Sequence, residues 1–209
     1  MLRLHVRMMV ITLALFAAML LLFRAQHYDE QERREWFVGD GCSAACFVGI
    51  RAGQTRVDEA VKLLAASEWI DAVDNRTINN VSGFISWTWS DKKPSWIDGR
   101  RDGRIWASQE QVVTITVYTV LGVGDSHLAL GAPDQGSIDR TADRKGIMSL
   151  YSEFYGRLGL IVQSWQPCRV LEPLRPQIFL TYFNQSDPRL FPEADSLSDL
   201  RHSCAIPRS

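Results

Sequence analysis

The sequence predicts an α+β fold, in which an N-terminal transmembrane helix is followed by two successive helix-plus-antiparallel-sheet units. Three observations carry the prediction: an apolar run near the N-terminus, helical spacing followed by strand-like alternation, and four cysteines. Of 209 residues, 46% are hydrophobic and 22% are charged, and the net charge is −1. This composition excludes a disordered chain, a collagen-like repeat and a strongly basic nucleic-acid-binding protein.

Residues 8–23 carry the membrane prediction. This run, MMVITLALFAAMLLLF, has Thr12 as its one polar member. As a helix it would measure about 24 Å, against a hydrocarbon core of about 30 Å, and the long side chains of Arg7 and Arg24 at its ends reach toward the headgroups. Basic residues precede the run and acidic residues follow Arg24, which favours a cytoplasmic N-terminus and an extracytoplasmic body. We therefore expect residues 1–25 to form an uncleaved, single-pass signal anchor.

A cleaved signal peptide is the alternative for this segment. Such a peptide requires small residues at positions −3 and −1 after the apolar run. The chain reads Arg24-Ala25-Gln26-His27 at that point, which offers no such pair. Lipidation would require a cysteine at the end of the run, and the first cysteine, Cys42, lies well beyond it. The uncleaved anchor is favoured, and cleavage stays open.

The four cysteines, Cys42, Cys46, Cys168 and Cys204, fit an oxidising compartment. We expect two disulfides and favour the pairs 42–46 and 168–204 over a bond between Cys46 and Cys168. A zinc site would need two short cysteine knuckles, and the second pair is widely separated. The spacing of Cys42 and Cys46 excludes a C-x-x-C redox motif. Free buried thiols are the alternative if the body were cytoplasmic.

The order of the remaining segments follows from composition. Residues 26–40 are charged and helix-permissive, which predicts a juxtamembrane stalk that ends at Gly39-Asp40-Gly41. We expect the body to occupy residues 41–209, with units at about 47–120 and 121–185 and an irregular tail at 186–209. Three of the 23 basic residues and no acidic residue lie in residues 1–24, so the rest of the chain carries 20 basic and 24 acidic residues.

The first unit opens with a helix. Apolar residues recur at helical spacing from Val57 to Leu64, which predicts a helix over residues 55–66 with one buried face. Thr55, with Asp58 three residues later, resembles a capping box, so we expect the Thr55 side chain to cap this helix.

Strand patterns follow this helix. Residues 81–90 alternate so that Ile85, Trp87 and Trp89 share one face, which predicts a half-buried antiparallel strand. The other predicted strands cover residues 104–107, 112–120, 146–152, 158–164 and 177–183. A short run at residues 127–130 lies near the start of the second unit.

Two family resemblances support this architecture. The run Gly49-Ile50-Arg51-Ala52-Gly53-Gln54-Thr55, leading to Glu59-Ala60 and Leu63-Leu64, resembles the G-x-T-x-x-E/Q-A/V-x-x-L-L opening of small outer-membrane-assembly lipoproteins and beta-lactamase-inhibitor-like domains. That resemblance implies a helix packed on an antiparallel sheet.

The second resemblance covers roughly residues 42–165. Three segments are similar to the C-W/F-x-G-I-x-P-G-x-T and L-T-L-G-D…L-G-x-P elements of uncharacterised bacterial membrane-anchored extracytoplasmic proteins. They are Cys46-Phe47-Val48-Gly49-Ile50, Leu121-Gly122-Val123-Gly124-Asp125 and Leu130-Gly131-Ala132-Pro133-Asp134. Ala52 stands where that group has proline. The resemblance implies architecture and location, and it brings no activity.

The motifs of the common enzyme families are missing from the sequence, which has no G-x-S-x-G, H-E-x-x-H, P-loop or EF-hand pattern. We therefore predict no catalytic, cofactor-binding or metal-ligating residue. Residues 125–127, Asp-Ser-His, are the three residue types of a hydrolytic triad. Neighbours in a chain rarely face one another, so a helix cap is the favoured interpretation of this tripeptide. Asp98 and Asp102 flank Arg100 and Arg101, which would oppose a cation, so this segment is expected to be a solvated loop.

The tryptophans decide between two function classes. Trp87 and Trp89 are expected in the core, because they share a face with Ile85. Trp96, on a predicted exposed loop at residues 91–103, is the better candidate for partner contact, together with Arg100 and Arg101.

The function expected from these features is that of a non-enzymatic envelope protein that binds a protein or another envelope component. Glycan or peptidoglycan binding through an aromatic face and loop 91–103 is the alternative, and an unrecognised hydrolase is the third class. Nucleic-acid binding is disfavoured, because the arginines of this loop form a small basic patch on an acidic body.

Overall fold

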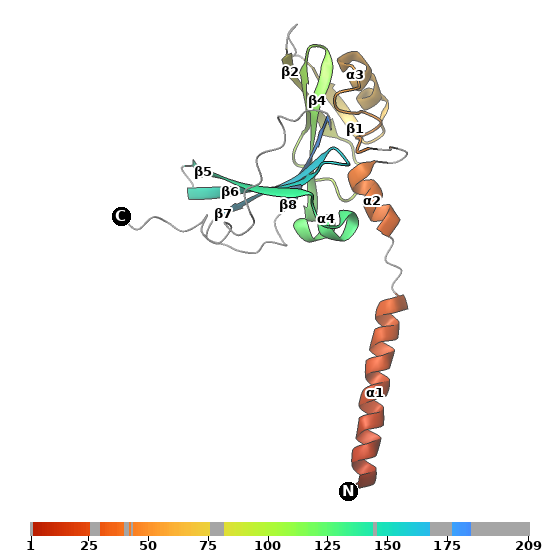
Figure 1. The fold of residues 1–209 in the computed structure, drawn as a ribbon. Helices are drawn as coiled ribbons and strands as arrows, with labels where there is room; N and C mark the ends of the chain where they lie inside the picture. The colour runs from red at the N-terminus through yellow and green to blue at the C-terminus, as the bar shows by residue number, and fades with distance from the viewer. Residues whose placement is uncertain are drawn as a thin grey trace, which may run out of the picture. The chain divides into compact units, whose positions relative to one another are not determined.

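The computed structural model describes residues 2–25, 30–39, 42, 44–75, 82–143, 146–167 and 177–184 (Figure 1). The chain divides into two units, Met1–Glu30 and Gln31–Ser209. The first holds helix α1 (Leu2–Ala25), whose described apolar side chains from Met8 to Leu21 are exposed. Among the described residues, no helix meets the length and apolarity expected of a membrane span. The predicted tail at 186–209, Cys168 and Cys204 lie outside the described residues.

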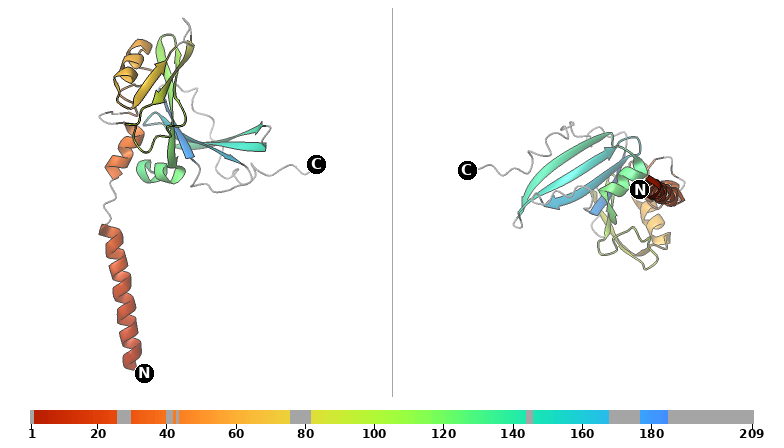
Figure 2. Two further views of the ribbon diagram at one scale, coloured as in Figure 1. Left: turned by 180° about the vertical axis from the view of Figure 1, so that it is seen from behind. Right: turned by 90° about the horizontal axis from the view of Figure 1, so that it is seen from below.

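The second unit is built on one antiparallel sheet of eight strands, in the order β1-β2-β3-β4-β8-β7-β6-β5 (Figures 1 and 2). The helices of this unit are α2 (Glu30–Val38), α3 (Val57–Ala66) and α4 (Val123–Leu130). The strands are β1 (Ile70–Asp74), β2 (Ser82–Trp89), β3 (Gly103–Ser108), β4 (Gln111–Gly122), β5 (Gln135–Asp143), β6 (Gly146–Tyr155), β7 (Leu160–Pro167) and β8 (Gln177–Phe183).

The topology has an internal regularity. Helix α3 precedes the run β1–β4, and helix α4 precedes the run β5–β8. The two runs meet where β4 pairs with β8, with Val117 opposite Leu180. The mixed helix-and-strand class and the antiparallel pairing are therefore confirmed, but the strands of the two predicted units join in a single sheet. The predicted domain boundaries themselves stay predictions.

One face of the sheet carries the hydrophobic core. Ile85 is fully buried and Trp87 is 1% exposed. Phe47, from the loop before α3, stacks on Trp87 with ring centroids 5.6 Å apart and meets Trp89 edge-on at 5.9 Å. Gly103, opposite Trp87 in the β2–β3 register, leaves room for the indole ring, which a Cβ atom at that position would meet. The prediction that these tryptophans belong to the core is confirmed.

The end of the predicted stalk is built into the body. Phe37, in the last turn of α2, is fully buried in the core cluster. The amide of Cys46 donates to the carbonyl of Val38 at 2.8 Å. Cys42 and Cys46 form a disulfide with their Cα atoms 6.2 Å apart, so this predicted pair is confirmed. The proposed bond between Cys168 and Cys204 stays a prediction.

The predicted role of Thr55 is wrong. Helix α3 begins at Val57, and Arg56 at its N-cap makes no side-chain cap bond. The Thr55 hydroxyl instead accepts a hydrogen bond from the amide of Arg51 at 2.9 Å and so closes the turn before the helix. The Thr55 carbonyl accepts from the amide of Val112 at 3.1 Å, which ties this turn to β4. Because the backbone at Thr55 is engaged with β4, the helix starts later than the capping pattern implies.

Candidate functional site

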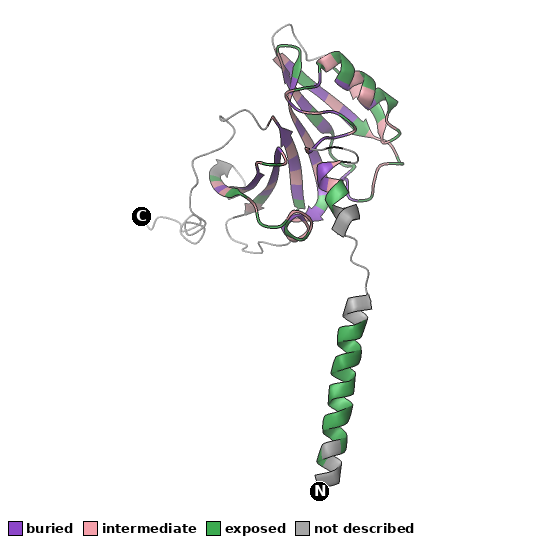
Figure 3. Ribbon diagram, turned by 45° about the vertical axis from the view of Figure 1, so that its right-hand side comes forward, coloured by how far each residue is buried: buried purple, intermediate pink, exposed green. Residues whose placement is uncertain are grey.

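The face of the sheet opposite the core is the candidate site. Helix α3 contacts β1 and β4, and helix α4 contacts β4 and β7. Both helices pack on the core face, since Leu64 of α3 and Val123 of α4 belong to the core cluster. Successive side chains of a strand point to opposite faces of the sheet, so buried residues alternate with half-buried or exposed ones along β2 and β3, and the burial colours of Figure 3 show such alternating bands. No described helix therefore covers the opposite face.

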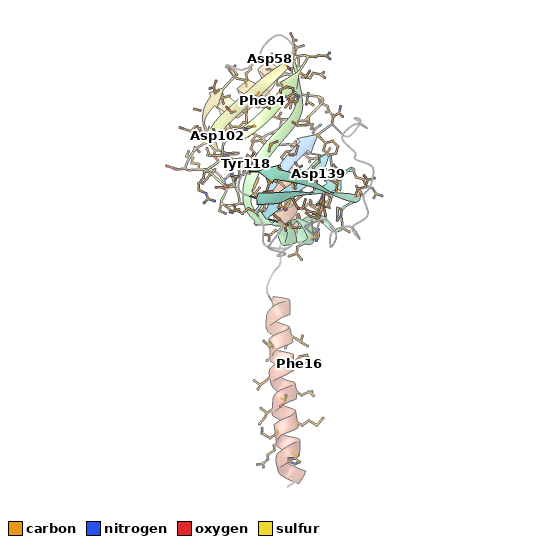
Figure 4. All side chains as sticks on the ribbon, turned by 90° about the vertical axis from the view of Figure 1, so that its left-hand side faces the viewer. Phe16, Asp58, Phe84, Asp102, Tyr118 and Asp139 are labelled. Carbon is orange, nitrogen blue, oxygen red and sulfur yellow. A yellow bond between two sulfur atoms is a disulfide. The ribbon has the colours of Figure 1, made fainter. Side chains whose placement is uncertain are left out.

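This face is called the open face below, and its side chains are half-buried or exposed. Its members are Phe84 on β2, Arg104 and Trp106 on β3, Thr114, Thr116 and Tyr118 on β4, Phe179 and Thr181 on β8, and Gln163 and Trp165 on β7. On the same side, Phe154, Ile161 and Phe183 form a small buried cluster. Figure 4 labels Phe84 and Tyr118 on two strands of the open face.

Aromatic side chains stand in cross-strand pairs on the open face. Phe84 and Trp106 face each other across β2 and β3 with ring centroids 4.6 Å apart. Tyr118 and Phe179 do the same across β4 and β8 at 5.5 Å. Phe84 is 48% exposed and Trp165 is 44% exposed. Exposed aromatic side chains gathered on one face of a folded domain are typical of a contact surface.

Three arginines gather at one corner of this face, named here the arginine corner. Arg100, Arg101, Asp102, Arg104 and Tyr118 line a shallow pocket of about 350 Å³. Arg104 lies opposite Thr116 in the β3–β4 register, so the corner is continuous with the open face. Among the described residues, no carboxylate lies in ion-pair contact with Arg101 or Arg104.

Arg100 is engaged differently from its neighbours. Its Nε and Nη2 atoms donate to the two carboxylate oxygens of Asp98 at 2.9 and 3.1 Å. These bonds hold the pKa of Asp98 below its ordinary value, although burial of the carboxyl acts in the opposite direction. The Asp98 carboxylate is therefore neutralised by Arg100, and the charge left over at the corner belongs to Arg101 and Arg104, offset in part by Asp102.

The predicted site residues separate into two groups. Arg100 and Arg101 lie on the surface beside Tyr118, in the arginine corner. Trp96 is 7% exposed and belongs to the core, so the expectation of an exposed tryptophan on loop 91–103 is wrong. The loop folds back along β4, where the amide of Val120 donates to the Trp96 carbonyl at 2.9 Å and the amide of Asp98 donates to the Tyr118 carbonyl at 3.0 Å. These bonds turn the indole inward.

A second polar cluster surrounds Glu153, a residue that the sequence patterns did not single out. Glu153 is fully buried on β6. His127 Nε2 lies 2.5 Å from Glu153 Oε1, and the Tyr151 hydroxyl donates to the same oxygen at 2.7 Å. The Tyr155 hydroxyl donates to Oε2 at 3.3 Å. Burial, followed by the effect of Glu153, raises the pKa of Tyr151 and Tyr155, which keeps both phenols protonated as donors.

This cluster connects helix α4 to strand β6 and does not have the geometry of a hydrolytic triad. Asp125 accepts a hydrogen bond from the amide of Gly122 at 2.9 Å, which is the helix-cap role predicted for this tripeptide. Ser126 is fully buried, and its hydroxyl donates to the Val123 carbonyl at 2.7 Å. The nearest partner of His127 is Glu153 rather than Ser126. A hydrolase needs an accessible nucleophile in contact with a base, and Ser126 and His127 do not supply that pair.

The chain was also compared with known proteins. No family model, no curated protein and no solved structure matches it. The two resemblances noted in the sequence stay resemblances. Among the described residues, no group of three or more metal-ligating side chains comes together. Function is therefore inferred from the surface of the molecule.

Proposed function

We propose that the protein is a membrane-anchored, extracytoplasmic binding protein whose open face docks an acidic partner protein. The observation that carries the proposal is the combination of paired aromatic side chains with Arg101 and Arg104, for which the described residues supply no carboxylate partner. Both features lie on a sheet face that no described helix covers. Tryptophan, tyrosine and arginine are the residues that dominate binding energy at protein interfaces. All three occur together on this face.

The ring geometry favours a protein partner over a glycan. A sugar stacks on an aromatic ring that presents its flat face to solvent. Phe84 and Trp106 lie at an interplanar angle of 53°, and Tyr118 and Phe179 lie at 38°, so the two rings of each pair are tilted to one another and do not form one flat platform. The open face also extends across five adjacent strands of the sheet, from β2 to β7, so it offers a broad surface rather than a single ring. Glycan binding is the competing outcome of the test below.

The charge distribution supports an acidic partner. The chain beyond residue 24 has a small excess of acidic residues, so its overall field would repel an acidic protein. Arg101 and Arg104 supply positive charge at one corner of the open face, where no described ion pair neutralises it. Local complementarity of this kind fixes the orientation of a partner and accelerates its encounter at low ionic strength.

The proposed location rests on the N-terminal segment. Helix α1 exposes its described apolar side chains along its length, including Phe16, labelled in Figure 4. Exposed apolar surface of that extent is unfavourable in water and is stabilised in lipid. The Cys42–Cys46 disulfide supports an oxidising compartment for the body. An uncleaved single-pass anchor with the body outside the cytoplasm accommodates both observations.

Site-specific photo-crosslinking in cells tests the docking face. A photoreactive residue at Thr116, in the middle of the open face, is expected to form adducts that a protease removes. The matched control is Lys62, an exposed residue of α3 on the other side of the sheet, which should give few adducts. Adducts at Thr116 that glycan hydrolases remove and proteases leave intact would favour the glycan alternative. Equal adduct yields at the two positions would contradict a specific docking face.

A further inference from the structure

A second surface feature lies on the opposite side of the body, at the C-terminal end of α2. It is a pocket of about 480 Å³, and five aromatic residues are among those that line it, namely Trp36, Phe47, Trp69, Trp96 and Tyr182. This volume falls within the range of roughly 300–1,000 Å³ that is usual for small-molecule sites. Residues from α2, from both loops that flank α3 and from β8 converge there, so the pocket is a product of the tertiary fold.

The aromatic wall is preformed. Phe47, Trp96 and Tyr182 are at most 7% exposed and are held by core packing. Phe47 contacts Trp69 at a centroid distance of 6.4 Å and Tyr182 at 6.2 Å. Cys46 of the disulfide also lines the pocket, which restrains the loop that carries Phe47. A ligand would therefore bind without ordering the residues that form the wall.

The charge of the pocket selects among ligand classes. Glu35 is the one charged side chain that lines it, among the described residues. No described basic side chain lies in ion-pair contact with Glu35. Tyr182 is fully buried, and burial raises the pKa of its phenol, so it stays neutral. An anion would be repelled by Glu35, and a neutral apolar ligand would gain nothing from it.

We propose that this pocket binds an organic cation, namely a methylated ammonium group. The faces of indole and phenyl rings attract such cations, and the attraction grows when the cation leaves water. Glu35 adds a carboxylate at the wall, and the soft, weakly hydrated ammonium loses little on entering an aromatic site. The group could be carried by a free amine or by a lipid headgroup, and both sources present the same chemistry. The inference does not rest on the docking role of the open face.

Calorimetric titration of the full chain in maltoside detergent tests this assignment. Choline is the probe, and 3,3-dimethylbutan-1-ol, its neutral carbon analogue of the same shape, is the control ligand. We expect choline to bind at least about tenfold more tightly than the analogue, since the analogue lacks the charge that aromatic faces and Glu35 recognise. Equal affinity for the two ligands, or no saturable binding of choline, would overturn the proposal.

Variants locate the site. Glu35→Gln is expected to weaken choline binding by about tenfold, and Trp69→Leu by a similar factor. The matched control is Glu59→Gln, an equal charge change on an exposed residue of α3, which should leave binding unchanged. Because Glu35 is exposed, its variant keeps the test informative if Trp69→Leu fails to fold. Unchanged choline binding in Glu35→Gln, with the native thermal midpoint, would also overturn the proposal.

A competition arm distinguishes the two sources of the ammonium group. Dihexanoylphosphatidylcholine, which dissolves as a monomer, presents the headgroup without a bilayer. Dihexanoylphosphatidylglycerol, whose anionic headgroup has the same acyl chains and phosphate but no ammonium group, is its control. Displacement of choline by the first lipid and not by the second supports the site and assigns a headgroup. Choline binding that neither lipid displaces supports the site and assigns a free amine. Displacement by both lipids alike would mean that the acyl chains fill the pocket, and this result contradicts recognition of the ammonium group.

Discussion

Arg101 lies over the ring of Tyr118, with its guanidinium carbon 4.8 Å from the ring centroid. The two residues come from different elements, the end of loop 91–103 and strand β4, and their contact joins the arginine corner to the aromatic part of the open face. The carbonyl of Arg101 also accepts a hydrogen bond from Trp89 Nε1 at 2.8 Å, so its backbone is fixed to β2. The charge at this corner is thus held in place before any partner arrives.

The buried carboxylate of Glu153 should govern the stability of the α4 region. Replacement by Gln keeps the volume but puts an amide donor where Tyr151 or His127 now donates. We expect Glu153→Gln to lower the free energy of unfolding by about 1–3 kcal/mol, as measured by urea denaturation. Asp139→Asn on the neighbouring strand β5 is the matched control, because Asp139 is exposed. Equal urea midpoints for the two variants would show that the Glu153 network contributes nothing specific.

The Arg100–Asp98 pair should make stability depend on pH in a defined direction. The pKa of Asp98 is lowered in the folded state by the hydrogen bonds from Arg100. A lowered folded pKa stabilises the fold above the unfolded-state value of about 3.9, and the contribution is lost as the pH falls through the folded value. Arg100→Gln is therefore expected to unfold more easily than the native chain at about pH 7, with the difference vanishing at about pH 2.

Lys62→Gln provides the control for that measurement, because it removes an equal charge from an exposed residue without a described ion pair. Its stability difference from the native chain should not follow the titration of Asp98. A difference between Arg100→Gln and the native chain that persists undiminished at the acid limit would show that the effect does not arise from Asp98.

The Cys42–Cys46 disulfide should appear in non-reducing peptide maps and contribute little to stability. It closes a very short loop, and in the chain-entropy model even a 15-residue loop contributes only about 3 kcal/mol. The double variant Cys42→Ala with Cys46→Ala should therefore lose less than about 3 kcal/mol of unfolding free energy. A bond between Cys168 and Cys204 is expected in the same map. Four alkylatable thiols in protein purified without reductant would contradict both pairs and the extracytoplasmic location.

The proposed membrane anchor predicts a specific fractionation pattern. Full-length chain should sediment with membranes, and protease added from outside should digest the body while the N-terminal segment stays protected. Removal of residues 1–25 should release the body into the soluble fraction, with its thermal midpoint unchanged. Recovery of a soluble mature form that starts near residue 26 would instead show cleavage after the apolar run.

Sequence patterns predicted the strands whose side chains alternate strongly. Strand β8 covers the predicted residues, Gln177–Phe183. The ends of β2 and β4 lie within two residues of the predicted ends. These strands bury one side chain in two, so the period is visible in the sequence. The sequence patterns did not predict strand β5, Gln135–Asp143, because its residues are mostly polar. The strand forms by antiparallel pairing with β6. Strand β1 was missed because it is short.

The candidate sites were harder to predict than the strands. The alternation of residues 81–90 places Phe84 on the face of the strand that does not carry Ile85. This was the one sign in the sequence of an aromatic open face. The contact of His127 with Glu153 depends on how α4 packs over β6, which no local pattern encodes. Trp96 was expected outside because its loop is polar, but backbone hydrogen bonds to β4 turn the loop inward. Tertiary contacts therefore decided the positions of His127 and Trp96.

The central claim is that charge on the open face selects the partner, and one measurement tests it directly. The yield of protease-sensitive adducts from a photoreactive residue at Thr116 is compared between the native chain, Arg104→Glu and Lys62→Glu, at matched expression. Arg104→Glu should reduce the yield by about tenfold, because it places a carboxylate against an acidic partner, whereas Lys62→Glu should leave the yield within about twofold of native. An undiminished yield in Arg104→Glu, or an equal loss in both variants, would contradict the claim.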